Sequence, residues 1–98
     1  MSDPAPKGRL HLSGHLFCAS AQEQALVEQY LPEHIRLTRA EPGCLSFEVT
    51  QTDDSSVWRV EECFTDRAAF DAHQLRAGAS LWGQKTQGIR RAYEITED

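Results

Sequence analysis

The sequence predicts a single α+β domain whose strands and helices follow the order β-α-β-β-α-β. Three observations predict this order. Apolar and polar residues alternate in four segments, apolar residues recur at intervals of three and four in two others, and turn-forming residues separate the six segments. A chain of 98 residues is long enough for one domain with a modest core.

Composition and charge narrow the classes of function. A hydrophobic content of 40% and a charged content of 26% are typical of a globular protein. The net charge of −5 opposes binding to the phosphates of nucleic acid. No apolar run is long enough to span a membrane, and residues 1–9 are too polar for a signal peptide. We therefore expect a cytoplasmic protein that binds neither nucleic acid nor a membrane, and whose three cysteines are reduced thiols.

The first part of the chain is predicted to hold a lead and a strand. Residues 1–8 are polar and contain two prolines, which indicates a flexible lead to a single domain formed by residues 9–98. Residues 9–19 alternate between apolar and polar side chains. One face of the predicted strand carries the apolar side chains Leu10, Leu12, Leu16 and Cys18.

The first helix is predicted to begin at Ser20. The Ser20 hydroxyl and the Glu23 carboxylate have the spacing of a capping box, which satisfies two backbone N–H groups at a helix start. The helix should end before the turn Glu41-Pro42-Gly43. Pro32 lies inside it and, because proline has no N–H, predicts a kink near Leu31.

A β-hairpin is predicted over residues 44–52 and 56–65. If Asp53 and Asp54 alone form its loop, four cross-strand pairs follow: Phe47 with Val60, Glu48 with Arg59, Val49 with Trp58, and Cys44 with Cys63. A register longer by two residues would instead place Glu48 opposite Glu61. Because like charges directly opposite each other are unfavourable, we expect the shorter register.

The second helix and the last strand complete the pattern. Thr65 or Asp66 can cap the helix, and Gly78 should end it. Its inward stripe consists of Ala69, Phe70, His73 and Ala77. Residues 79–87 then suggest a short helical turn and residues 89–96 a strand. This order matches the ferredoxin-like sandwich, which has both helices on one face of the sheet, and a symmetric dimer would cover the other face.

The strongest chemical signal is Glu62, the one charged residue on the apolar face of the hairpin. A buried carboxylate is costly unless it is paired, neutralised or beside a wet cavity. His73, on the inward stripe of the following helix, is the nearest partner along the chain. The pattern predicts a Glu62–His73 pair, which is either catalytic or a structural ion pair between helix and sheet.

Aromatic side chains are predicted to converge between the sheet and the helices. They are Phe47, Trp58, Phe64, Phe70, Trp82 and Tyr93. Aromatic walls suit a flat aromatic ligand, although the same residues also suit a plain core. Trp82 is the one we place at the pocket mouth, and His34 also lies on an inward stripe. Neither the histidines nor the cysteines have the spacing of a metal site, so we expect none.

The sequence resembles the antibiotic biosynthesis monooxygenase (ABM) domain family, and within it the quinol monooxygenases, over about residues 10–95. The resemblance rests on Glu41-Pro42-Gly43-Cys44-Leu45-x-Phe47 and on the later run from Val60 through Glu62, Phe64 and Phe70 to His73. It implies a dimeric α+β barrel with a pocket in each subunit. It also implies oxidation of phenols or quinols by O₂ without metal or flavin, with Glu62, Phe64 and His73 in the pocket.

Two positions depart from the family pattern. Many relatives have Trp at the position of Phe64. Members that cleave haem have a pocket Asn on the first strand, where this chain offers Gly14, His15 or Leu16, which argues against haem cleavage.

The function we expect is that of a cofactor-independent monooxygenase acting on a quinol or polyphenol. His73 is its candidate base and Glu62 the group that orients His73. The expected substrate pocket consists of Phe64, Phe47, Trp58, Phe70, Trp82 and His34. The alternative is a homodimeric binding or stress-response module of the same fold, which sequesters or senses a small aromatic compound or a reactive carbonyl without turning it over.

Overall fold

The computed structural model describes residues 8–98, so most of the predicted N-terminal lead lies outside the described residues. The elements are β1 (Leu10–Phe17), α1 (Ala21–Arg39), β2 (Cys44–Gln51), β3 (Val57–Phe64), α2 (Arg67–Ala79), α3 (Leu81–Lys85) and β4 (Arg90–Glu97). The predicted order is confirmed, and α3 is the predicted short helical turn. No helix within residues 8–98 is long and apolar enough to cross a membrane.

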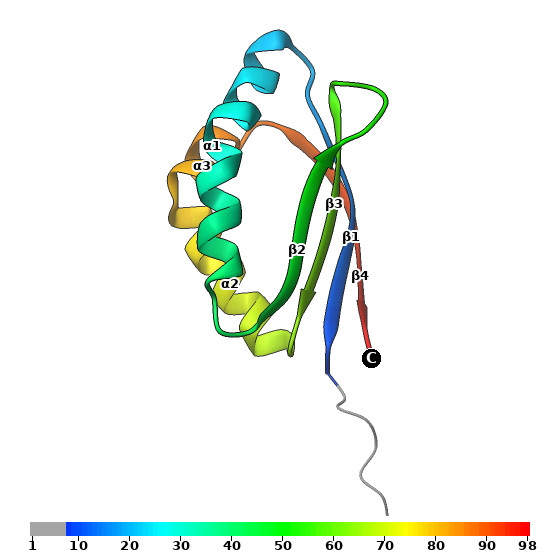
Figure 1. Cartoon of the computed structure of the whole chain (residues 1–98), viewed down its shortest axis with the longest axis vertical. Coiled ribbons are helices and arrows are strands. Elements are labelled where there is room, and N and C mark those ends of the chain that lie inside the picture. Colours follow the sequence, from blue (N-terminus) through cyan, green and yellow to red (C-terminus); the bar gives the residue numbers. More distant parts are fainter. Residues whose placement is uncertain (1–7) are drawn as a thin grey trace, which may run out of the picture.

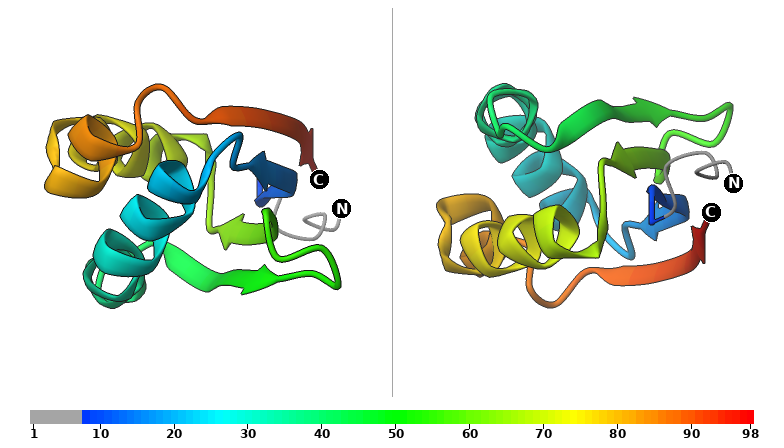
Figure 2. Two further views of the ribbon diagram at one scale, coloured as in Figure 1. Left: turned by 90° about the horizontal axis from the view of Figure 1, so that it is seen from above. Right: turned by 90° about the horizontal axis from the view of Figure 1, so that it is seen from below.

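The four strands form one antiparallel sheet in the order β2-β3-β1-β4. All three helices lie on one side of this sheet, as Figure 1 and the two views of Figure 2 show. The predicted ferredoxin-like arrangement is therefore confirmed. The other side of the sheet has no cover from residues 8–98.

Local signals in the sequence account for α1. The Ser20 hydroxyl accepts a hydrogen bond from the backbone N–H of Glu23 at 3.1 Å, and the Glu23 carboxylate accepts one from the N–H of Ala19 at 2.7 Å. From this start the helix runs to Arg39 through Pro32 as one element. Its buried side chains are Val27, Leu31, His34 and Thr38.

The register predicted for the hairpin is wrong. Val49 pairs with Val60 and Glu48 with Glu61, which is the register longer by two residues. The loop spans residues 52–56 instead of two residues, and the Asp54 carboxylate holds it by accepting from the N–H and hydroxyl of Ser56 at 3.0 and 2.7 Å.

Two arginines explain why the like-charged pair is tolerated. An Arg39 amino group lies 3.2 Å from a Glu48 carboxylate oxygen, and an Arg59 amino group lies 2.6 Å from one of Glu61. Each carboxylate therefore has its own counter-charge.

The start of β2 also differs from the expectation. Cys44 lies opposite Phe64 and not Cys63, and the three cysteines are free. Strand alternation would place Leu45 on the same apolar face as Phe47. The register instead shifts between Cys44 and Ser46, which leaves Leu45 51% exposed.

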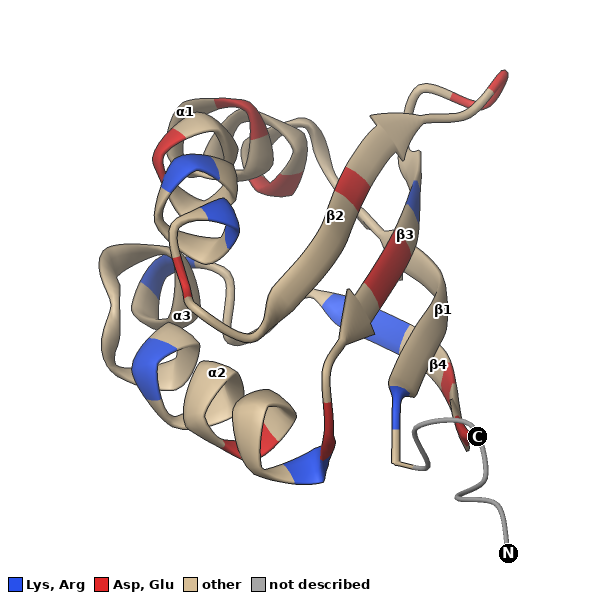
Figure 3. Ribbon diagram, turned by 60° about the horizontal axis from the view of Figure 1, so that its bottom comes forward, with Lys and Arg blue, Asp and Glu red and all other residues tan. Residues whose placement is uncertain are grey.

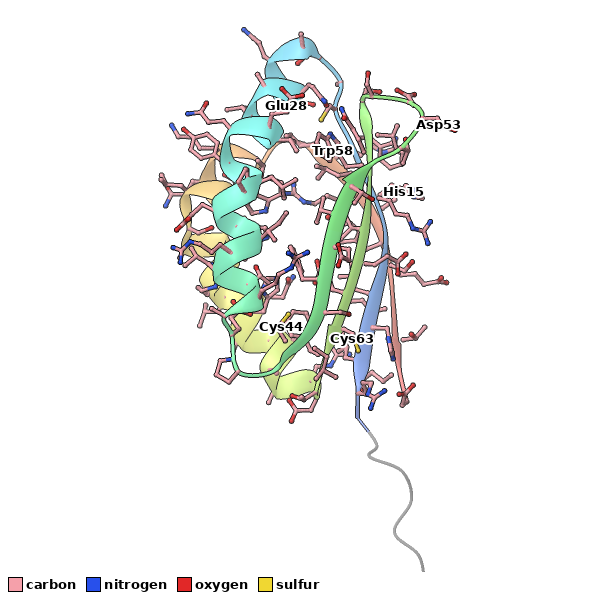
Figure 4. All side chains as sticks on the ribbon, in the orientation of Figure 1. His15, Glu28, Cys44, Asp53, Trp58 and Cys63 are labelled. Atoms are coloured by element: carbon pink, nitrogen blue, oxygen red, sulfur yellow. The ribbon has the colours of Figure 1, made fainter. Side chains whose placement is uncertain are left out.

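The core lies between the sheet and the helices. Because a register shift of two residues leaves each side chain on its own face, the other predicted inward residues of the hairpin stay inward. Figure 4 shows Trp58 between α1 and the sheet and His15 on the opposite side. The buried apolar side chains of the strands are Leu10, Leu12, Leu16, Phe47, Val49, Trp58, Val60 and Phe64.

Two glycines allow the close approaches that shape this interior. A Cβ at Gly14 would come within 2.1 Å of the Ala92 carbonyl oxygen and 2.8 Å of Tyr93 Cδ1. Tyr93 of the neighbouring β4 can therefore pack this close to β1 only because residue 14 is a glycine. A Cβ at Gly83 would come within 2.2 Å of the Ala77 carbonyl oxygen, so α3 packs directly on the end of α2.

Candidate functional site

A cavity of about 300 Å³ lies between the sheet and the helices. The strands contribute Leu16, Phe47, Val49, Val60, Glu62, Arg91 and Tyr93, and the helical side contributes His34, His73, Gln74, Trp82 and Gln87. A volume of this size suits a small ligand, and the mixture of aromatic walls with a few polar groups is typical of a small-molecule site.

His73 lies between two glutamates, Glu41 and Glu62, and both His73 and Glu62 line the cavity. His73 Nδ1 is 3.1 Å from Glu41 Oε1, within hydrogen-bonding distance. His73 Nε2 is 3.9 Å from Glu62 Oε1, too far for a direct hydrogen bond. His73 and Glu62 are 3% and 8% exposed, and Glu62 Oε1 has no hydrogen-bond partner among the described residues.

Glu41 is itself held in place by a basic side chain. Arg76 on α2 donates from Nε to the Glu41 carboxylate, and another of its nitrogens donates to the hydroxyl of the buried Thr38 at 3.0 Å. The turn after α1 therefore carries a carboxylate that is tied to α2 through both Arg76 and His73.

Burial governs the protonation of this group. It raises the pKa of Glu62 to about 7, with the negative charge of Glu41 as a smaller cause. Burial also lowers the pKa of His73, and Glu41 opposes that shift through its charge and its hydrogen bond. Because a carboxylate only accepts, the neutral imidazole carries its proton on Nδ1, which leaves the lone pair of Nε2 facing Glu62.

A second histidine forms part of the wall of the cavity. The ring of His34 stacks on that of Trp82, with centroids 4.8 Å apart and planes at 8°, and meets the edge of Phe47 at 5.3 Å. Burial lowers the pKa of His34 to about 3, helped by the charges of His73, Arg76 and Arg91. His34 is therefore neutral, and its Nδ1 has no partner among the described residues.

Behind this stack lies an outer groove between α1 and α3, of about 320 Å³. Its apolar lining includes Tyr30, Leu37 and Leu81, and both His34 and Trp82 also line it. The stacked pair is thus a partition that touches the cavity on one side and the outer groove on the other.

The family model described as antibiotic biosynthesis monooxygenase matches residues 14–79. The chain belongs to the ABM family. This confirms the resemblance to the ABM family, and the matched range contains both motifs, from Glu41 to His73. No curated protein matches the sequence.

Solved structures share the ABM fold with this chain. SnoaB from Streptomyces nogalater, described as a cofactor-independent oxygenase, is 12% identical, with 91% of each chain covered and a TM-score of 0.76. PA3566 from Pseudomonas aeruginosa is 23% identical, with 96% of this chain and 95% of that chain covered and a TM-score of 0.71. SO0527 from Shewanella oneidensis is 22% identical, with coverage of 93% and 91% and a TM-score of 0.72.

Five of the predicted site residues lie together in this ABM domain. Glu62, His73, Phe47, Trp82 and His34 all line the cavity.

The other three lie behind its wall. Phe64 and Phe70 pack edge to face at 5.8 Å, and Phe64 supports the His73 ring at 5.0 Å. Trp58 is buried and donates from its indole N–H to Gln24 at 3.0 Å. These three side chains are part of the core.

Sequence reasoning assigned no role to Glu41 or Arg91. Glu41 stands in a turn, where no periodicity indicates which way a side chain points. Arg91 could have been found, because it alternates with Ile89 and Tyr93 and so shares their face of β4, as Glu62 shares an apolar face of β3. Within residues 8–98 no three His, Cys, Asp or Glu side chains are grouped as a metal site would need.

Proposed function

We propose that this ABM protein is a cofactor-independent monooxygenase that oxidises a small aromatic substrate, a quinol or polyphenol, with O₂ in the cavity. The observation that carries the proposal is the gap of 3.9 Å between His73 Nε2 and Glu62 Oε1. The gap is too wide for a hydrogen bond between the two atoms, so neither side chain is satisfied by the other. Both residues line the cavity, where a substrate hydroxyl can meet the imidazole and the Glu62 carboxyl.

In this arrangement a substrate hydroxyl donates its proton to His73 Nε2. Glu62, whose pKa is raised to about 7, supplies an O–H that hydrogen-bonds to the phenolate oxygen as it forms. Glu41 accepts from Nδ1–H at 3.1 Å and stabilises the imidazolium. His73 is then the catalytic base, and Glu41 is the residue that orients it. The sequence alone had indicated Glu62 for this orienting role.

The phenolate is electron-rich enough to react with O₂ directly. One electron passes to O₂, and the substrate radical and superoxide combine to form a carbon–oxygen bond, which gives a peroxide after protonation. Loss of the proton from that carbon and cleavage of the O–O bond then yield a new carbonyl group and release water. One oxygen atom of O₂ enters the product and the other enters water, and the substrate supplies the electrons.

The walls of the cavity support a flat substrate. Phe47 and the stacked rings of His34 and Trp82 offer faces and edges against which an aromatic ring can pack. The description of SnoaB as a cofactor-independent oxygenase agrees with this chemistry, although its 12% identity shares only the fold.

The proposal is tested by oxygen uptake with a panel of hydroquinones and naphthols, with and without a chelator. We expect one O₂ per substrate, no effect of the chelator, and one labelled oxygen atom in the product when ¹⁸O₂ is used. His73→Ala should abolish uptake, whereas His15→Ala, on the opposite side of the sheet, should not. Tight binding of these compounds without any uptake would favour the non-catalytic binding module instead.

A further inference from the structure

Arg91 is the basic side chain in the wall of the cavity, and no carboxylate of residues 8–98 forms an ion pair with it. Arg39 and Arg76, by contrast, each form an ion pair with a glutamate. An unpaired guanidinium on a cavity wall is a ready partner for an anion.

The guanidinium is held rigidly. One terminal nitrogen donates to the carbonyl oxygens of Thr86 and Ile89 at 2.8 and 3.0 Å, and the other donates to the Thr86 hydroxyl at 2.9 Å. Thr86 is itself fully buried and donates its hydroxyl proton to the Trp82 carbonyl. These bonds use three of the five N–H groups of the guanidinium. Arg91 also hydrogen-bonds the Tyr93 hydroxyl, which partly offsets the rise in the Tyr93 pKa that burial causes. At least one N–H group is left for another acceptor.

The strand register places Arg91 at the opposite end of the cavity from the catalytic pair. Glu62 on β3 lies opposite Leu12 of β1, whereas Arg91 on β4 lies opposite Leu16. Four residues along a strand correspond to about 13 Å, and β3 and β4 flank β1 on its two sides. Figure 3 shows the basic segment at the start of β4, which contains Arg90 and Arg91, crossing behind the acidic part of β3.

We infer that Arg91 is an anion subsite and that the substrate is a hydroxyaromatic acid, with its hydroxyl between His73 and Glu62 and its carboxylate on Arg91. The inference rests on the proposed function and names its substrate class. The register places Val60 and Tyr93, which both lie opposite Gly14, between the two ends. Both side chains line the cavity, so a ring system that spans it would lie against one aliphatic and one aromatic side chain. Arg91 also lies near the Trp82 ring, with its Cζ 5.9 Å from the centroid, so an acid bound there would lie beside the aromatic wall.

Binding of two probes to the wild-type protein without oxygen tests the inference. They are 2-naphthol and 6-hydroxy-2-naphthoate, which share a ring and a hydroxyl and differ in a carboxylate at the far end. We expect calorimetry near pH 7 to give a dissociation constant roughly tenfold lower for the carboxylate, the gain typical of a charge-assisted hydrogen bond. The isomer 3-hydroxy-2-naphthoate, with adjacent groups, should not show this gain.

Arg91→Gln should remove the preference for the carboxylate, so that the dissociation constants of the two probes for the variant agree within about twofold. Arg90→Gln is the matched control, since it removes the same charge from the next residue, whose guanidinium lies over the Phe17 ring at 4.5 Å. This control should keep the preference.

Equal affinity of the wild-type protein for the two probes would overturn the inference, and so would a preference that survives Arg91→Gln. Arg91 would then only clamp the segment between α3 and β4. The wild-type comparison decides even if Arg91→Gln fails to fold. Oxygen uptake is measured separately, so an oxygenase that ignores the carboxylate would defeat the anion subsite and leave the proposed function intact.

Discussion

Protonation of Glu62 is directly linked to folding. Its pKa is raised from 4.5 to about 7 in the folded protein because the carboxyl is buried. The folded state therefore binds the proton more tightly than the unfolded state does. Stability is unaffected well below pH 4.5 and is lost as the pH rises through 7.

Glu62→Gln should remove this loss because glutamine has a similar shape and no charge. We expect the variant to be more stable than the wild type above pH 8 by at most about 3 kcal/mol, and the advantage to vanish near pH 4.5. Urea unfolding at both pH values measures the difference. Glu48→Gln is the exposed control, and it should not stabilise the protein because it removes the partner of Arg39. An alkaline gain missing from Glu62→Gln would contradict a neutral buried carboxyl.

Glu41→Gln tests whether the carboxylate positions and tunes His73. The charge of Glu41 raises the pKa of His73, so its removal should move the acid limb of the pH–rate profile to lower pH. We expect kcat to fall roughly tenfold or more, with a smaller change in KM, because the imidazolium loses its counter-charge. Glu33→Gln, which breaks only an exposed pair with Arg36, should leave the profile unchanged. A merely structural Glu41 would lower stability without moving the acid limb.

The sequence predicts whether a side chain points inward where the residue belongs to a periodic strand or helix. It does not predict that the partner of His73 is Glu41. Strand alternation placed Glu62 inward, and helical spacing placed His73 inward. The partner of His73 depends on how the turn after α1 packs against α2. Glu41 lies in that turn, where no strand or helix periodicity predicts the orientation of a side chain. Phe64 and Phe70 were predicted to be inward as well, but alternation does not say which inward side chains reach the cavity.

At the level of the elements, the pairing of β1 with β4 leaves no room for a side chain at Gly14. Gly14→Ala should destabilise the protein by roughly 2 kcal/mol, because the added Cβ meets backbone that cannot move without breaking the ladder. It should also displace Tyr93 from the cavity and weaken binding of naphthols. Thermal melts and calorimetry measure the two effects.

Gly78→Ala is the control for this prediction. Nothing lies within 4 Å of a Cβ built at Gly78, and alanine is preferred to glycine in a helix such as α2. We expect unchanged or slightly higher stability. A Gly14→Ala variant as stable as Gly78→Ala would contradict the close packing of β1 and β4.

For the hairpin, the sequence predicts the strands and their faces but not the register between them. Alternation located both strands and their faces, because every register that differs by two residues presents the same faces. The choice among these registers rested on one unfavourable pair, Glu48 with Glu61. Arg39, at the end of α1, forms an ion pair with Glu48 and so reduces the repulsion in that register. No residue of the hairpin itself indicates that Arg39 lies beside Glu48.

For the whole molecule, the fold could be predicted from the order of the elements, because few arrangements of β-α-β-β-α-β bury every apolar face. The face of the sheet turned away from the helices is left without cover by residues 8–98, and Phe17, Val57 and Cys63 are half-buried on it. We predict that two copies associate through this face. Sedimentation at micromolar concentration should give twice the 11.0 kDa mass of the chain.

Phe17→Glu should weaken this association, because it places a charge in the predicted interface. Leu75→Glu is the control, since Leu75 on α2 is 79% exposed on the helical side. A wild-type protein that sediments as a monomer would contradict the predicted dimer, as would a Phe17→Glu variant that dimerises like the wild type.

The partition formed by His34 and Trp82 limits how large a substrate can be. A cavity of about 300 Å³ lies on one side of it and an outer groove of about 320 Å³ on the other. A single change such as Trp82→Ala on α3 would join the two spaces. His73 on α2, Glu62 on β3 and Glu41 in the turn after α1 all lie outside α3. Substrate size can therefore evolve separately from the chemistry, and a descendant of this protein could admit a compound with more rings in one mutational step.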